Sequence, residues 1–380
     1  MIYFDNAATT GAKPPEVINA VNRALREYSV NPGRGGYDLS ARCSEEIFQC
    51  RQKISDFFNA KAPERVIFTP NCTTAINYCI KGICRKGDHI VASSLEHNAV
   101  ARPLYKLQRE GADVDFAEVI FGDPDATLRV FRKLIRPDTR LVVCTHASNV
   151  TGEIMPIEGI GEICAEYGVP FMVDAAQTAG VVNIDMQRCK IDYLCIAPHK
   201  GLYAPMGTGI LISLGEIPDT LVEGGTGSMS ISYEQPIDYP ERFESGTINV
   251  PGIMGISAGI GFVKSKGIDR IYRHETELIQ YIYDGLKDIK EVVLYTERPT
   301  IGRFVPTLSF NIRGLDSATA ASVLAKEGIA TRAGLHCAPM AHRRLGTVDI
   351  GTVRLCCSVF NNKLQADRLL NCVKTIAKTS

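Results

Sequence analysis

The sequence has no excess of charge of either sign, because 42 Lys and Arg residues balance 42 Asp and Glu residues. Such a chain has no surplus of positive charge to hold a phosphate backbone or an anionic membrane surface. Nucleic acid and membrane lipid are therefore not expected as partners.

Long apolar runs are also absent. No window approaches the ~18 uninterrupted apolar residues of a membrane-spanning helix. The N-terminus MIYFDNAATT lacks the basic region and apolar run of a signal peptide. We therefore expect a cytoplasmic protein. In that compartment its thirteen cysteines, an odd number without a regular spacing, are expected to be reduced.

Length and composition instead indicate an ordinary globular protein. A chain of 380 residues that is 45% hydrophobic and 22% charged can bury a large core, and its length predicts two domains. The sequence contains no G-x-G-x-x-G after a predicted strand and no G-x-x-x-x-G-K, so two common nucleotide-binding fingerprints are missing.

Short apolar runs alternate with helical patterns over the first 250 residues. Runs bounded by Gly, Pro or charged residues are typical of strands that are buried on both faces. The predicted strands are 65–70, 88–94, 140–148, 169–177, 191–200 and 209–213. Helical stretches between them, such as 73–87 and 157–168, end at glycines. The alternation predicts an α/β fold in which helices cover both faces of a parallel sheet.

A different pattern begins near residue 250. One long helical segment, 251–289, is followed by strand-like runs at 304–312 and 352–359 and by a final helix. This pattern predicts a smaller α+β C-terminal domain. We place the large domain at 13–260 and the small domain at 261–380, together with the N-terminal segment 1–12.

Polar residues follow several predicted strands at their carboxyl ends, where ligands collect in open α/β sheets. Residues 71–73 stand at the start of a helix, so they fit either a phosphate cradle or a simple N-cap. His97 is either functional or a loop histidine with locally satisfied hydrogen bonds. Asp174 ends a strongly apolar strand, where an unpaired carboxylate would be costly to bury. Lys200 ends the next strand, and taken alone it is as compatible with solvation as with a function.

Together these residues fit one cofactor. Pyridoxal phosphate requires a lysine for its aldehyde, a carboxylate for its pyridine nitrogen, an anion site and an aromatic group over its ring. Lys200, Asp174, the 71–73 turn and His97 supply all four. The combination predicts a pyridoxal phosphate site.

Seven motifs also carry a family resemblance. In chain order they are YFDNAATT, EHNA, SNVTGEIMPI, VDAAQ, HKGLYAPMGTG, RFESGTINVPG and TRAGLHCAP. The ordered set resembles the class V, fold-type I pyridoxal phosphate enzymes of the cysteine desulfurase and selenocysteine lyase group. The form R-x-G-x-H-C-A is similar to the group II desulfurases. The resemblance covers the whole chain and implies a large domain with a mainly parallel, seven-stranded sheet.

The resemblance implies roles around the cofactor. Lys200 would bind the cofactor covalently and later move the α-proton of the substrate. Asp174 would contact the pyridine nitrogen, Gln177 would lie near the phenolic oxygen, and His97 would stack on the ring. The residues implied around the phosphate and its helix N-terminus are Asn71, Cys72, Thr73 and His199, joined by Thr247 from a second subunit.

It also implies how the substrate is held. Arg354 would bind the substrate carboxylate through a two-pronged hydrogen-bonded pair. Asn149 would contact cofactor or substrate, with Arg332 nearby. The family is dimeric with shared active sites, so the resemblance implies a homodimer in which Arg34 also acts across the interface.

Cys337 lies in the stretch TRAGLHCAPMAHRR and has three interpretations: a nucleophile, a metal ligand or a buried thiol. Gly334, Pro339 and Arg332 in the same stretch favour an exposed, electropositive loop, which suits a reactive thiolate. The competing metal site would use His336, Cys337 and His342, with help from the cysteines at 356–357. We expect the nucleophile and no metal. The other cysteines lie in apolar runs and are expected to be packing residues.

The resemblance then implies an activity. The enzyme would convert L-cysteine to L-alanine, with a persulfide formed on Cys337 and passed to an acceptor, which could be a protein. Three alternatives stay open: a selenocysteine lyase acting on L-selenocysteine, an aminotransferase or β-lyase that does not use Cys337, and a non-enzymatic thiol or metal-binding protein.

Overall fold

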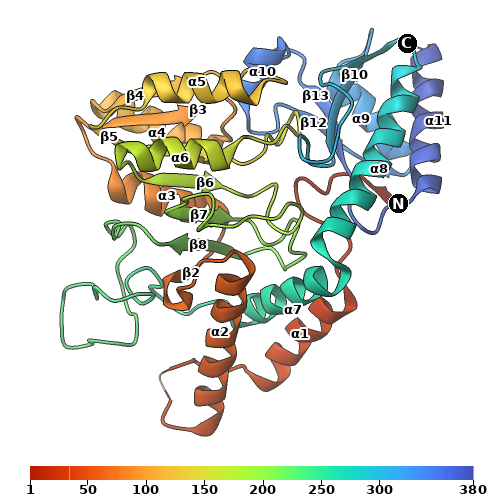
Figure 1. Cartoon of the computed structure of the whole chain (residues 1–380). Helices are drawn as coiled ribbons and strands as arrows, with labels where there is room; N and C mark the ends of the chain where they lie inside the picture. Colours follow the sequence, from red (N-terminus) through yellow and green to blue (C-terminus); the bar gives the residue numbers. More distant parts are fainter. Residues whose placement is uncertain (34, 380) are drawn as a thin grey trace.

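The computed structural model describes residues 1–33 and 35–379 and is built around one large sheet (Figure 1). Its seven strands lie in the order β2 (Val66–Thr69), β8 (Gly209–Ser213), β7 (Tyr193–Ile196), β6 (Phe171–Asp174), β5 (Thr139–Thr145), β3 (His89–Ser93) and β4 (Asp113–Ala117). β8 runs in the direction opposite to the other six strands of this sheet. The predicted α/β fold with a mainly parallel seven-stranded sheet is confirmed.

Most strands of this sheet carry apolar side chains on both faces, so helices cover both faces of the sheet. One face packs under α2 (Asp38–Phe57), α5 (Pro124–Leu134), α6 (Ile157–Tyr167) and α7 (Val250–Lys266). The other face packs under α3 (Cys72–Ile83) and α4 (Asn98–Glu110). Helix α1 (Pro15–Glu27) lies against α7, and the short 3-10 helix η1 (Pro63–Arg65) precedes β2. The two apolar layers thereby fix the carboxyl ends of the parallel strands at one edge.

The C-terminal part of the chain forms a second sheet with its own core. This sheet is antiparallel, in the order β12 (Arg332–Gly334), β13 (Thr352–Cys356), β10 (Thr307–Ile312) and β9 (Val292–Leu294). The helices packed around it are α8 (Ile268–Lys287), α9 (Ser317–Lys326) and α11 (Lys363–Thr379). Helix α10 (Pro339–Leu345) packs instead against the core of the large domain. The first strand, β1 (Ile2–Tyr3), pairs with β11 (Ile329–Ala330), so the N-terminal segment belongs to this core (Figure 1).

Three local expectations were wrong. Strand β4 was missed, because its residues DVDFA include two aspartates and do not form an apolar run. The segment 251–289 is two helices rather than one, since Gly267 adopts φ 82°, a left-handed conformation that glycine reaches at little cost and that ends α7. Helix α3 ends at Ile83 and not at a glycine.

All thirteen cysteines are unpaired, and Cys337 is the exposed one. Within residues 1–33 and 35–379, no helix has both the length and the apolar composition needed to cross a membrane.

Candidate active site

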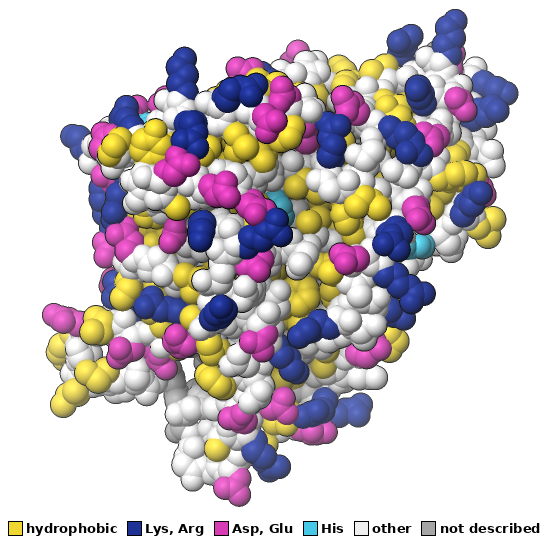
Figure 2. Space-filling view, viewed as in Figure 1, with side chains coloured by type: hydrophobic (Ala, Val, Ile, Leu, Met, Phe, Trp, Pro, Cys, Tyr) yellow, Lys and Arg dark blue, Asp and Glu magenta, His cyan; other side chains and the backbone are white. Residues whose placement is uncertain are grey.

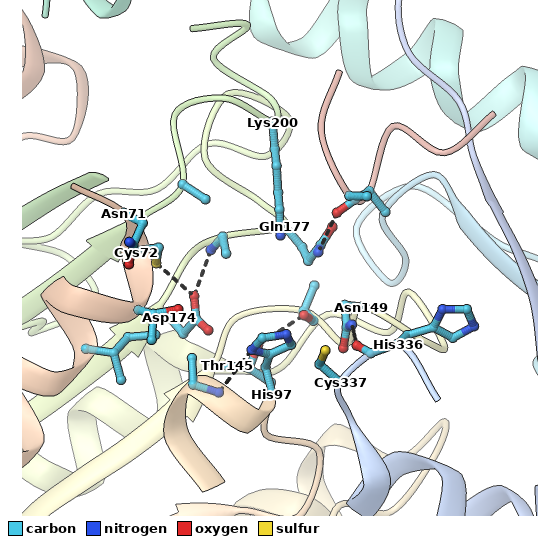
Figure 3. Close-up of a pocket in the computed structure, with 18 of the residues that line it drawn as sticks. Asn71, Cys72, His97, Thr145, Asn149, Asp174, Gln177, Lys200, His336 and Cys337 are labelled. Carbon is cyan, nitrogen blue, oxygen red and sulfur yellow. Dashed lines mark hydrogen bonds between the residues drawn. The ribbon is translucent and has the colours of Figure 1, made fainter. Parts of the chain in front are cut away.

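A cavity of about 220 Å³ opens where the carboxyl ends of β5, β6 and β7 meet the first turns of α3 and α4 (Figure 3). Most of the residues predicted for the site line this one cavity. They are Asn71, Cys72, Thr73, His97, Asn149, Asp174, Gln177, His199, Lys200, Arg332, Cys337 and Arg354. Thr247 does not line the cavity and is exposed on a loop. Arg34 lies outside the described residues.

Lys200 lies in the turn that follows β7 and extends along one side of the cavity (Figure 3). Burial lowers the pKa of its ammonium group, and the nearby Asp174 carboxylate only partly opposes this effect. A neutral amine is the form that condenses with an aldehyde, so a desolvated lysine suits covalent attachment of a carbonyl compound.

Asp174 is the last residue of β6 and its side chain faces the cavity (Figure 3). Its Oδ1 accepts a hydrogen bond of 2.9 Å from the Ala176 amide, and the Cys72 thiol lies 3.8 Å from the same oxygen. Burial raises the pKa of the Asp174 carboxyl group. Because the Asp174 carboxyl group lines the cavity, a ring N–H bound there can reach it.

The first turn of α3 forms an anion cradle. The side chain of Asn71 caps the helix by accepting a hydrogen bond of 2.9 Å from the Thr74 amide. The amides before Thr74 belong to the first turn and have no acceptor within the helix, so they can bind an anion. Gly209 permits this turn, because a Cβ there would lie 2.2 Å from the carbonyl carbon of Asn71. His199 also lines the cavity, and its Nδ1 is buried without a partner among the described residues. The donor set and this orphaned nitrogen fit a phosphate group.

His97 caps the N-terminus of α4. Its Nδ1 accepts a hydrogen bond of 3.1 Å from the Ala99 amide, so this nitrogen is unprotonated. Burial, together with the charges of Lys200 and Arg354, lowers the pKa of His97 to about 4. The ring is therefore neutral near pH 7 and can lie against the face of another aromatic ring.

Arg354 lies in β13, and its guanidinium reaches the cavity from the small domain with 3% of its side chain exposed. Nη1 donates to the carbonyl of Asn149 at 3.1 Å, and Nη2 donates to Oδ1 of Asp5 at 2.9 Å. Arg332, opposite Arg354 in the β12–β13 ladder, also lines the cavity. Two guanidinium groups at one wall favour a carboxylate ligand.

Cys337 occupies a strained and tightly held loop. His336 and Cys337 have φ values of 49° and 56°, in the left-handed region that non-glycine residues rarely adopt. The Cys337 carbonyl accepts a hydrogen bond of 2.7 Å from the Asn98 amide, and the His336 carbonyl accepts one of 2.7 Å from Asn149 Nδ2. These bonds fix the thiol at the cavity wall, next to His97 (Figure 3).

The metal interpretation of this loop has little geometric support. His336 and His342 are separated by five intervening residues, a spacing that zinc sites use, and their ring centroids lie 5.6 Å apart. One nitrogen of each ring already has a partner: Nε2 of His336 faces the Thr352 carbonyl at 3.0 Å, and Nδ1 of His342 faces the Thr347 hydroxyl at 2.8 Å. The other nitrogen of each ring is buried without a partner among the described residues. No group of three or more His, Cys, Asp or Glu side chains in the described part of the chain is arranged to hold a metal ion.

Sequence reasoning assigned no role to several residues in and under the site. Asp5 pairs with Arg354, and Ala7 and Thr145 line the cavity. Glu96 is buried below the cavity, where it accepts hydrogen bonds from Ser93 and the Thr145 amide, and burial raises its pKa to about 8. Asp5 lies in the motif YFDNAATT and Glu96 in the motif EHNA. Both motifs contributed to the family resemblance, so these carboxylates could have been chosen as candidates from the sequence.

Comparison with known proteins agrees with this geometry. The sequence profile of the family described as Aminotransferase class-V matches residues 2–369. A probable cysteine desulfurase from Methanothermobacter thermautotrophicus is 32% identical, over 99% of this chain and 94% of the relative. Another from Pyrococcus abyssi is 33% identical, over 100% of this chain and 95% of the relative.

Solved structures show the same likeness. The apo structure of a cysteine desulfurase from Thermococcus onnurineus superposes with a TM-score of 0.91 at 31% identity, covering 100% of this chain and 95% of that one. A cysteine desulfurase from Escherichia coli has a TM-score of 0.86 at 26% identity, covering 99% and 94%. The chain is therefore an enzyme of the aminotransferase class-V family, which depends on pyridoxal phosphate, and it is homologous to cysteine desulfurases.

Proposed function

We propose that this enzyme is a cysteine desulfurase that converts L-cysteine to L-alanine and retains the sulfur as a persulfide on Cys337. One observation supports this most directly: the exposed thiol is clamped at the wall of the cavity that also contains Lys200 and Asp174. An aminotransferase or β-lyase needs the lysine and the carboxylate but has no need of a thiol at this place.

Each residue of the cavity would have a separate role in the reaction. Lys200 removes the proton from Cα of the substrate and returns a proton later, and Asp174 keeps the ring nitrogen of the cofactor protonated. Arg354 and Arg332 bind the substrate carboxylate. Asn149 connects Arg354 to the loop of Cys337, because its carbonyl accepts from Arg354 and its side-chain amide donates to the His336 carbonyl. The cofactor, when bound, supplies an electron sink for the charge that develops at Cα.

Sulfur transfer then needs only the Cys337 thiolate. Its sulfur attacks Sγ of the substrate, so an S–S bond forms while the Cβ–Sγ bond breaks and leaves its electron pair on the carbon fragment. Protonation of that fragment completes the methyl group of alanine. A second thiol, on a small molecule or an acceptor protein, can then take the outer sulfur of the persulfide.

Product analysis tests the proposal. With L-cysteine and a reducing thiol, the enzyme should release alanine and sulfide in equal amounts. Pyruvate and ammonia in place of alanine would show a β-lyase, and a sulfur-containing keto acid would show an aminotransferase. The same assay with L-selenocysteine measures the lyase alternative, because that substrate presents the same carboxylate, amine and side-chain length.

We further propose that the active enzyme is a symmetric dimer with shared sites. Residues 214–249 form a long excursion from the large domain, and hydrophobic side chains gather at its projecting tip (Figures 1 and 2). Ile231 and Tyr233 within residues 214–249 are almost fully exposed, which is unusual for large apolar side chains unless a partner covers them. Thr247 follows in the same excursion and would complete the phosphate site of the partner, together with Arg34 at the interface.

Mixing two inactive chains tests the shared site. A Lys200→Ala chain and a Thr247→Ala chain should each have little activity, but a mixed dimer contains one site with both intact residues. After subunit exchange of equal amounts, about a quarter of the wild-type sites should be restored, since half of the dimers are mixed and each has one good site. Alanine release measures the recovery. Absence of recovery, with exchange shown by tagged chains, would contradict the shared site.

A further inference from the structure

The N-terminal segment from Tyr3 to Lys13 runs from the small domain to the turn that carries Lys200. At one end, β1 pairs with β11, and the Phe4 carbonyl accepts a hydrogen bond of 2.6 Å from the Cys356 amide. This end therefore lies beside β13, two residues from Arg354. The segment is fixed to the same small sheet that carries the arginine.

The other end of the segment is fixed to the large domain. The carbonyl of His199 accepts hydrogen bonds from the Thr9 hydroxyl, the Thr10 amide and the Lys13 ammonium, each at 3.1 Å. Between the two ends, the Ala7 carbonyl accepts a hydrogen bond of 3.2 Å from Gln177 Nε2. Asp5 thus sits in a backbone that is held on both sides of the cavity.

The Asp5 carboxylate forms its side-chain hydrogen bond and ion pair with Arg354. Its Oδ1 accepts from Nη2 at 2.9 Å, with 20% of the Asp5 side chain and 3% of the Arg354 side chain exposed. The Asn149 carbonyl holds Nη1, whereas Nε is buried without a partner among the described residues. Two fixed acceptors therefore set the plane of the guanidinium and leave the Nε–H unused.

We propose that Asp5 is a positioning residue that orients Arg354 to bind the α-carboxylate of the substrate. The inference rests on the proposed function only in taking an amino acid as the substrate. A guanidinium recognises a carboxylate best through two parallel N–H groups, so its plane decides the strength of the pair. Without Asp5, only the Asn149 carbonyl holds the group, and the arginine can turn about its own side-chain bonds.

Ligand titration of the cofactor-loaded enzyme tests this inference without using sulfur chemistry. L-Alanine and L-alaninamide have the same amine and methyl group, but only L-alanine has a carboxylate. Binding of each is followed by the change in the absorption of the cofactor. Asp5→Asn should weaken L-alanine binding about tenfold or more, as expected for loss of an oriented hydrogen bond to a charged group, and should leave L-alaninamide binding unchanged.

Two further variants make the test specific. Asp192→Asn is the matched control, because this half-buried carboxylate accepts the Phe171 amide at the opposite end of the sheet. It should change neither affinity. In an Arg354→Lys background, Asp5→Asn should have little further effect on L-alanine binding, because a residue that acts through Arg354 has nothing left to orient.

Several results would overturn the inference. They are unchanged L-alanine binding by Asp5→Asn, equal weakening of both ligands, or additive effects with Arg354→Lys. If Asp5→Asn does not fold, Asp5→Glu keeps the charge but displaces the carboxylate, and it should still weaken L-alanine selectively. Failure of the desulfurase proposal is a separate result, since it appears as wild-type enzyme that makes no alanine from L-cysteine.

Discussion

Replacing Cys337 with serine is expected to lower alanine release from L-cysteine by several orders of magnitude while cofactor binding stays intact. In the proposed mechanism the steps at Cα use Lys200, Asp174 and Arg354, and none of these residues would depend on the thiol. Extraction of sulfur, in contrast, requires a nucleophile at Sγ. A serine hydroxyl is a far weaker nucleophile and cannot carry the sulfur, so the loss should match removal of a covalent nucleophile in other enzymes.

Intact-mass analysis after L-cysteine treatment is the measurement that checks this. The wild-type chain should gain one sulfur, ~32 Da, on the peptide that contains Cys337, as expected for a persulfide on a reactive thiol, and Cys337→Ser should not. Cys372→Ser is the matched control, because Cys372 is a partly exposed cysteine on α11 outside the cavity. Sulfur found on another cysteine, or undiminished alanine release, would remove Cys337 from the mechanism.

L-Selenocysteine gives a second readout from the same variant. Selenium leaves carbon more readily than sulfur and need not be attacked by a protein thiol. We expect Cys337→Ser to keep most of its activity on L-selenocysteine, measured as alanine released. A parallel collapse on both substrates would instead mean that the substitution has disturbed the loop, which two left-handed residues already strain.

The fold was predictable wherever burial on both faces of a strand leaves a continuous apolar run. Strands β2, β3, β5, β6, β7 and β8 are all of this kind. The edge strand β4 is not, because Asp113 is exposed and Asp115 is only half-buried, so its pattern resembled a loop. The break at Gly267 was missed because apolar periodicity continues on both sides of it, and only the backbone conformation separates α7 from α8.

The site was predictable to the extent that one rule of topology applies. Parallel strands end at one edge, so residues at or just after the carboxyl ends of β5, β6 and β7 had to meet, and Asn149, Asp174 and Lys200 do. Contacts made by other parts of the chain follow no such rule. Asp5 and Arg354 are 349 positions apart in sequence, and no periodicity or spacing relates them. A residue proposed to act across subunits, such as Thr247, cannot be placed by the fold of one chain.

Replacing Lys200 with alanine is expected to remove both the covalent attachment of the cofactor and the base at Cα. Burial lowers the pKa of Lys200, so the wild-type amine is ready to react with the cofactor aldehyde. A methyl group can neither form this bond nor transfer a proton. Turnover should therefore fall by several orders of magnitude, and the cofactor should be lost on gel filtration because only its noncovalent contacts remain.

Borohydride reduction followed by peptide mass analysis measures the attachment directly. In the wild-type enzyme the reduced cofactor should be found on the peptide that contains Lys200, and the Lys200→Ala chain should carry none. Lys13 provides the matched control, because burial lowers its pKa to about 8 and its ammonium group contacts the His199 carbonyl next to the site. Lys13→Ala should still carry the cofactor at Lys200. Attachment at Lys13 in the wild-type chain would contradict the assignment, because the reactive amine would then belong to the N-terminal segment rather than to the turn after β7.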